Sequence, residues 1–206
     1  IFFAGLSWRL LAPPLLLALA GLVLLWVFEA ELCAQGVSWP GLRDYQQQRV
    51  CTLLDPGRDP LGRGFHIIQG MIAIGSGGFW GKGFMQGTQT HLEFIPERTT
   101  DFIFAAYSEE FGLAGNLLLV LAFVFLVLRA LSIALEAPTL FSRLLAASLG
   151  MILFCYAFVN MGMVSGIPVG GVPLPFISYG GTAMVTLGLA LGMLMSIAKS
   201  KRLVQS

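Results

Sequence analysis

The protein has 206 residues, of which 56% are hydrophobic and 11% are charged, and its mean hydropathy is +0.81. Soluble domains carry roughly 25% charged residues, so this composition excludes an ordinary soluble domain and indicates a membrane protein. The net charge of +1 and the lack of a basic block in the sequence give no sign of nucleic-acid binding.

Apolar runs predict the membrane helices, each of which needs roughly 20 mainly apolar residues. Four long runs cover residues 9–28, 113–135, 144–165 and 180–198, and a shorter, Gly-rich run covers 65–80. The sequence starts with Ile1 and shows no signal-peptide pattern, so we expect a fragment of a longer protein. The predicted fold class is all-α: one polytopic membrane domain over 1–206 with about five transmembrane helices.

Arginine and lysine residues predict the orientation, because cytoplasmic loops are enriched in them. The tail carries Lys199, Lys201 and Arg202, which predicts a multi-pass protein with a cytoplasmic C-terminus. Counting back through five spans places the arginine-rich segment 43–63 inside as well. If the short run at 65–80 did not span, that arginine-rich segment would lie outside the cytoplasm, against the charge rule.

Glycine pairs and one asparagine in or beside the predicted spans suggest contacts between helices. Gly77 and Gly81, and likewise Gly188 and Gly192, have the GxxxG spacing of close helix contacts, although glycine is also simply common in membrane helices. Asn160 lies inside an apolar run, where we expect its amide to bond to a neighbouring helix.

The three cysteines give no sign of a metal site or of a disulfide framework. Cys33, Cys51 and Cys155 show neither metal-ligand spacing nor a disulfide framework. Cys155 lies in an apolar run, where a thiol behaves as a small hydrophobic side chain.

Residues 81–112 form a predicted large periplasmic loop. A long loop in a protein with short connections is usually functional. It gathers acidic residues against two basic ones: Glu93, Glu97, Asp101, Glu109 and Glu110 against Lys82 and Arg98. Glu109 and Glu110 follow Asp101 by about two helical turns, and we interpret both as interfacial charges.

Asp101 is the candidate reactive group of this loop. Thr99 or Thr100 is expected to cap a helix that begins near Asp101. The helix dipole and Arg98, three residues earlier, would then keep the carboxylate ionised and able to hold a cation or take a proton. The alternative is that Asp101 only stabilises the helix start and pairs with Arg98.

A second outer segment, residues 166–181, carries no charge and is rich in glycine and proline. Such backbone is tolerated at membrane depth where it is buried in protein or lines a polar cavity. The segment therefore predicts either a re-entrant-like stretch that frames a cavity or a plain apolar turn.

Two motifs in these segments resemble the SEDS family (shape, elongation, division and sporulation). Residues 96–104 read Pro-Glu-Arg-Thr-Thr-Asp-Phe-Ile-Phe, and residues 172–181 read Val-Pro-Leu-Pro-Phe-Ile-Ser-Tyr-Gly-Gly. Further stretches at 54–62, 66–69 and 87–89 look like the RodA branch of the family. The resemblance starts near Tyr45, and residues 29–44 match no pattern of the family.

The resemblance implies the second half of a ten-helix fold in the bacterial inner membrane. It implies a peptidoglycan glycosyltransferase that polymerises lipid II into glycan strands for elongation and rod shape, releasing undecaprenyl diphosphate. The implied partners are a class B penicillin-binding protein, which is a transpeptidase, and the elongation machinery. Because the first five helices of the family fold would be missing, we expect the fragment alone to be inactive.

The resemblance also implies roles for single residues. The family's essential aspartate corresponds to Asp101, as catalytic base or as the group that orients the base. Arg98, Lys82, Glu97 and Ser178 are candidate substrate-binding residues. The leaving diphosphate needs positive charge from Arg, from Lys or from a divalent cation such as Mg²⁺ or Mn²⁺; the sequence does not identify metal ligands. Thr99 stands where many relatives carry histidine, which argues against a direct role for this position.

Two other functions compete with polymerisation. One is a flippase for lipid-linked precursors, which, as a transporter, would place ionisable groups at mid-membrane. The other is a non-catalytic scaffold of the elongation machinery. The predicted spans are nearly free of acids and bases away from their ends, and the acids gather in an outer loop. This distribution favours chemistry at the membrane surface.

Overall fold

The computed structural model describes residues 8–34, 43–55, 57, 63–88, 99–167 and 171–199. The described residues are helical apart from turns and loops, and they contain no strand. The chain divides into two compact units, residues 1–68 and 69–206. The predicted all-α class is confirmed.

The first unit contains α1 (Trp8–Val27), α2 (Glu29–Leu32), α3 (Asp44–Leu54) and the start of α4 (Arg63–Gly77). α1 coincides with the first predicted span, and it includes Pro13 and Pro14 in its second turn. α3 starts where the Arg43 N–H donates to Gln46 Oε1 at 3.0 Å.

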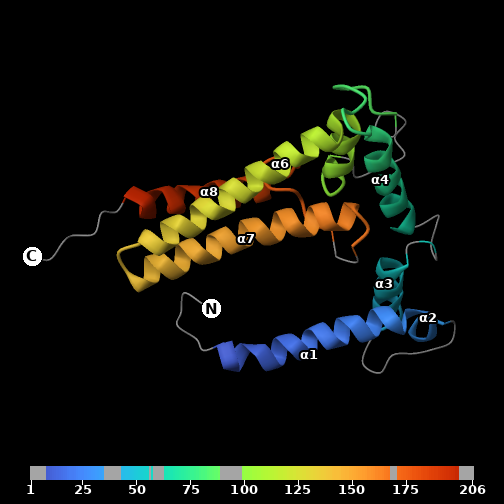
Figure 1. The fold of residues 1–206 in the computed structure, drawn as a ribbon, viewed down its shortest axis with the longest axis horizontal. Coiled ribbons are helices and arrows are strands. Elements are labelled where there is room, and N and C mark those ends of the chain that lie inside the picture. The colour runs from blue at the N-terminus through green and yellow to red at the C-terminus, as the bar shows by residue number, and fades with distance from the viewer. Residues whose placement is uncertain are drawn as a thin grey trace, which may run out of the picture. The chain divides into compact units, whose positions relative to one another are not determined.

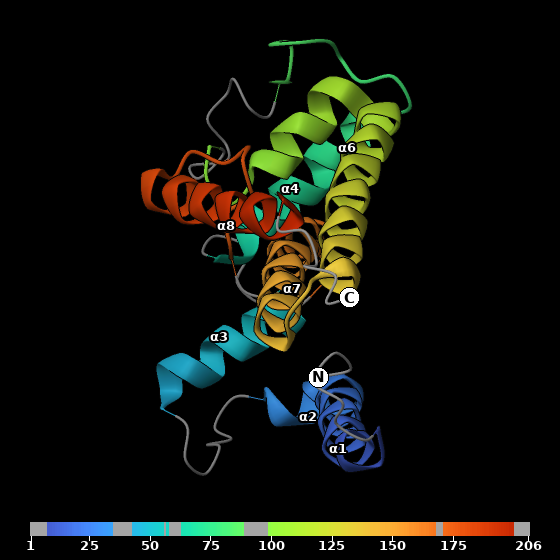
Figure 2. The same cartoon turned by 90° about the vertical axis from the view of Figure 1, so that its left-hand side faces the viewer.

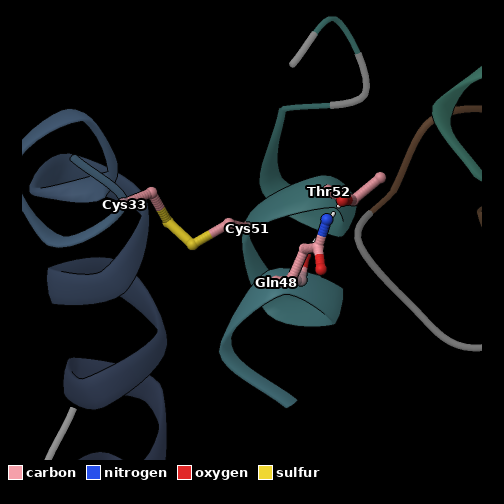
Figure 3. The surroundings of a disulfide bond; sticks show 4 residues. All are labelled: Cys33, Gln48, Cys51 and Thr52. Atoms are coloured by element: carbon pink, nitrogen blue, oxygen red, sulfur yellow. Dashed lines mark hydrogen bonds between the residues drawn. A yellow bond between two sulfur atoms is a disulfide. The ribbon is translucent and has the colours of Figure 1, made fainter. Parts of the chain in front are cut away.

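A disulfide in the first unit contradicts the prediction for the cysteines. Cys33, just after α2, is bonded to Cys51 in α3 with a Cα–Cα distance of 5.7 Å (Figure 3). The spacing of 18 residues matches no recognisable framework, and the pairing depends on how two short helices pack. Cys155 is the free cysteine and is exposed, in a helix of the second unit.

Three helices of the second unit are long and apolar enough to cross a membrane: α6 (Ile103–Glu136), α7 (Leu140–Val164) and α8 (Gly181–Lys199). They coincide with three predicted spans. α4 is helical but has 15 residues, fewer than the roughly 20 that a span needs. The membrane crossing expected at 65–80 therefore stays a prediction.

α6 and α7 lie side by side and run in opposite directions (Figures 1 and 2). Pro138 follows α6, and Thr139 caps α7 by accepting from the Ser142 N–H at 3.2 Å. The contact is made by small residues, since a Cβ built on Gly150 would lie 2.9 Å from Ala130 Cβ. Such residues allow helix backbones to approach closely in membranes.

The GxxxG pairs named from the sequence behave differently from one another. A Cβ on Gly188 or Gly192 of α8 would meet no described atom within 4 Å, so this pair makes no close contact in the described residues. Gly77 and Gly81 do make close contacts, because a Cβ there would collide with the carbonyl oxygens of Ser108 and Glu110, respectively.

Gly112 breaks α6 into two helical pieces. Its φ of 63° and ψ of −161° are non-helical, in a region that is essentially restricted to glycine. The backbone of residues 77–83 fills the break: Lys82 N–H donates to Glu109 O at 3.0 Å, and Leu113 N–H donates to Gly78 O at 3.0 Å. These bonds satisfy backbone groups that the break removes from the helix ladder.

We expect Gly112→Ala to lower the free energy of unfolding of the full-length protein by about 3 kcal/mol, from backbone strain and overpacking. A Cβ at this position would collide with the Gly81 nitrogen. Gly188→Ala is the matched control, because its Cβ meets open space among the described residues. Thermal unfolding in detergent measures both variants, and equal melting temperatures would contradict the role of Gly112.

Candidate functional site

Asp101 lies in a turn, residues 99–102, that leads directly into α6. α6 begins at Ile103 with Phe102 as its N-cap residue, and in the described part of the chain this position has no side-chain cap hydrogen bond. The expected cap by Thr99 or Thr100 is therefore wrong, and Asp101 is not in the first helical turn. The reason is that the carbonyl groups of Thr99 and Thr100 bond instead to a distant segment of the chain.

That segment is residues 171–179, which contain the second motif. Tyr179 N–H donates to Thr99 O at 2.8 Å, and Ser178 Oγ donates to Thr100 O at 2.7 Å. The same Ser178 hydroxyl accepts the Leu174 N–H at 2.6 Å, and the side chain is 4% exposed. The two motifs are thus held together by direct hydrogen bonds, one of which joins residues 78 positions apart in the sequence.

Asn160 of α7 completes this connection. Its Nδ2 donates to Asp101 O at 2.8 Å and to Val172 O at 2.6 Å, and the residue is 0% exposed. The expected bond to a neighbouring helix is wrong, because both acceptors are carbonyls of the two non-helical segments. The sequence indicated that Asn160 makes a hydrogen bond, because an amide inside an apolar span needs a partner. It did not indicate which groups accept that bond.

The carboxylate of Asp101 lies against Gly171, at the start of the described part of the second segment. A Cβ on Gly171 would collide with Asp101 Oδ2. Asp101 is partly exposed, whereas its neighbour Phe102 is 5% exposed. The arrangement therefore presents a carboxylate, on an anchored backbone, where the two motif segments meet.

Glu109, further along α6, forms an ion pair with Lys82, which lies in the loop after α4. Lys82 Nζ lies 2.7 Å from Glu109 Oε1, with the two side chains 29% and 0% exposed. Thr88 Oγ1 donates to the same carboxylate oxygen at 3.0 Å, and Ser76 Oγ donates to it at 3.4 Å. The prediction that Glu109 is an interfacial charge is wrong: it is buried, because the break at Gly112 and the 77–83 backbone enclose it.

The sequence-predicted site residues are only partly brought together. Ser178 contacts the segment that carries Asp101, whereas the ammonium group of Lys82 is engaged by Glu109. Glu97 and Arg98 lie outside the described residues. Across the described ranges, no group of three His, Cys, Asp or Glu residues is placed to hold a metal ion.

Comparisons with known proteins place these segments in a family context. The model of the FtsW/RodA/SpoVE family, described as cell cycle proteins, matches residues 1–203. The chain is 51% identical over 205 residues to the peptidoglycan glycosyltransferase MrdB of Escherichia coli K12, covering 99% of this chain and 52% of that protein. It is 46% identical to the peptidoglycan glycosyltransferase RodA of Treponema pallidum, covering 76% of this chain and 36% of that one.

A solved structure is also similar. It describes how a peptidoglycan synthase complex coordinates polymerization and crosslinking, and it superposes with a TM-score of 0.67 at 36% identity. The match covers 96% of this chain and 51% of that chain. The chain thus spans about half the length of MrdB and of the solved chain.

We expect Lys82→Met to destabilise the full-length protein by about 3 kcal/mol, because it leaves a buried carboxylate without its cation. Adding Glu109→Gln should restore part of the loss, since the neutral amide no longer needs a counter-charge. Denaturant unfolding measures the single and double variants, with Glu110→Gln as the neighbouring control. A Lys82→Met protein as stable as wild type would show that the pair has no structural role.

Proposed function

The chain belongs to the FtsW/RodA/SpoVE family of cell cycle proteins, and from this premise we propose that the whole protein is a peptidoglycan glycosyltransferase that polymerises lipid II. The names of the similar proteins support this activity. The observation that carries the proposal is the anchored Asp101, whose carboxylate lies where the two motif segments meet.

The proposed reaction joins two lipid-linked or chain-end sugars. A hydroxyl of the acceptor sugar attacks the anomeric carbon of the donor, a glycosidic bond forms, and the bond from that carbon to the diphosphate oxygen breaks. Undecaprenyl diphosphate leaves with the bonding electrons. The hydroxyl proton passes to Asp101, which is a general base in this scheme.

The developing charge on the diphosphate needs a positive partner. Arg98, three residues before Asp101 in the sequence, stays a proposed contact of the diphosphate, and Glu97 stays a proposed substrate contact. Lys82 would have to exchange Glu109 for the diphosphate, since its ammonium group is already paired. A divalent cation, Mg²⁺ or Mn²⁺, stays a proposal as well. Because the described residues do not assemble a set of acidic or histidine ligands, we assign the cation no step.

The family context extends to partners and location. We propose a class B penicillin-binding transpeptidase and the elongation machinery as partners, supported by the similarity to a chain of a peptidoglycan synthase complex. The three long apolar helices and the similarity to MrdB support a multi-pass membrane protein. We propose the bacterial inner membrane as its location from the family resemblance, and a cytoplasmic C-terminus from the charge bias of the loops.

We expect Asp101→Asn, in the full-length protein bound to its transpeptidase, to reduce lipid II polymerisation at least 100-fold. Asparagine keeps the size of the side chain but cannot accept the proton. A glycan-product gel with labelled lipid II measures the rate, and Thr99→His is the matched control on the same turn. Polymer at the wild-type rate from a folded Asp101→Asn complex would remove Asp101 from the chemistry. No polymer from wild type, in an assay validated with another polymerase, would contradict the proposed activity.

The disulfide offers a test of the orientation. The structure bonds Cys33 to Cys51, whereas the charge bias places residues 43–63 in the cytoplasm, where thiols are kept reduced. The proposed orientation therefore requires this disulfide to be open in the cell. We therefore expect both thiols to react with a membrane-permeant maleimide in intact cells, in a Cys155→Ser background. Labelling that requires prior reduction would place this segment on the oxidising side and reverse the proposed orientation.

A further inference from the structure

Three consecutive carbonyl groups before α6 accept hydrogen bonds from three different donors. Thr99 O accepts from the Tyr179 N–H at 2.8 Å, and Thr100 O accepts from Ser178 Oγ at 2.7 Å. Asp101 O accepts from Asn160 Nδ2 at 2.8 Å. We call these three bonds the carbonyl clamp. Two donors come from the second motif, and the third comes from the C-terminal part of the apolar helix α7.

The clamp restricts the backbone on both sides of Asp101. A peptide group is planar, so fixing its carbonyl fixes the whole plane. Ser178 fixes the plane before the Asp101 Cα, and Asn160 fixes the plane after it. The φ and ψ of Asp101 are then both held, and only the side-chain torsions remain to be set. The direction of the Asp101 Cα–Cβ bond is therefore determined by these two donors.

Asn160 differs from the other donors because it belongs to neither segment and bonds to both. The same Nδ2 donates to Val172 O at 2.6 Å, which fixes the second segment beside the clamp and next to Gly171. The amide orientation follows from these bonds, since the flipped amide would set an oxygen against two carbonyl oxygens. Oδ1 is buried and, within the described part of the chain, has no hydrogen-bond partner. Burial of an amide with an unsatisfied oxygen is unfavourable, and packing alone does not explain an asparagine here.

We propose that Asn160 is a positioning residue for glycan polymerisation, which aims the Asp101 carboxylate through the Asp101 carbonyl; this inference rests on the proposed function. Asn160 is not a catalytic residue, because it is 0% exposed and bonds backbone rather than substrate. The inference also gives Ser178 a positioning role in place of substrate binding. Its hydroxyl is buried and uses both its donor and an acceptor position within the protein.

The test uses the full-length protein in complex with its transpeptidase and compares Asn160→Ala and Ser178→Ala with wild type. We expect kcat to fall 10- to 100-fold in each variant, because small misplacements of a reacting group have effects of this size. The KM for lipid II should change less than threefold, because neither side chain contacts substrate. A rise in KM with unchanged kcat would instead indicate lost substrate binding and would overturn the inference.

A matched control separates positioning from stability. Leu153→Ala changes a buried residue of the same helix, 1% exposed and two turns away, and should lower the melting temperature by a similar amount or more. We expect it to keep kcat within threefold of wild type. An equal loss of kcat in Leu153→Ala would show that Asn160 acts only through general stability.

Hydrogen exchange gives a reading that is independent of activity. In Asn160→Ala, the non-proline amides of residues 99–102 and 172–179 should exchange faster together. Leu153→Ala should leave the exchange rates of these amides at their wild-type values. Unchanged exchange in Asn160→Ala would overturn the clamp. If wild type makes no polymer, the proposed function fails, and the exchange result still decides whether the clamp exists. Ser178→Ala provides the same comparison if Asn160→Ala does not fold.

Discussion

The arrangement of the second unit depends on the need of buried backbone groups for hydrogen-bond partners. The segment before α8 is not helical and satisfies only part of its own backbone, for example through the Ser178 N–H, which donates to Leu174 O at 3.1 Å. Pro173 and Pro175 reduce that need, since proline has no N–H to satisfy. Other backbone groups of the segment are paired with the turn before α6 and with Asn160: Tyr179 N–H donates to Thr99 O, and Val172 O accepts from Asn160 Nδ2. The same bonds that make an irregular segment tolerable in a membrane protein therefore also hold the reactive carboxylate in place.

The first piece of α6 is anchored at both ends by different forces. At its start, neutral hydrogen bonds hold residues 99–101. At its end, the Lys82–Glu109 ion pair and the backbone of 77–83 hold the helix against the end of α4. Between these anchors the side chains of Phe104, Ala105 and Ser108 are buried. A short helix that would be marginal alone thus becomes a rigid support for Asp101.

The sequence predicts the long helices and the two motif segments well, because apolar runs and glycine–proline composition are local signals. α7 and α8 begin and end within a few residues of their predicted limits. The contacts that build the site are not local. The donor targets of Asn160, the burial of Glu109 and the pairing of Cys33 with Cys51 each depend on residues far away in the sequence. The apolar run at 113–135 predicted the long apolar part of α6. It did not predict that the helix begins at Ile103 with Phe102, rather than a threonine, as its N-cap residue.

The break at Gly112 also bears on how α6 fits a bilayer. As one straight rod, its 34 residues would measure about 51 Å, well beyond a hydrocarbon core of about 30 Å. The piece after the break, residues 113–136, measures about 36 Å, which suits that thickness with a modest tilt. The charged Glu109 and the polar Ser108 belong to the other piece, so the break relieves the hydrophobic mismatch that a continuous helix would impose. The thickness of the surrounding lipid can therefore change the tilt of the long piece without requiring the short piece that supports Asp101 to follow.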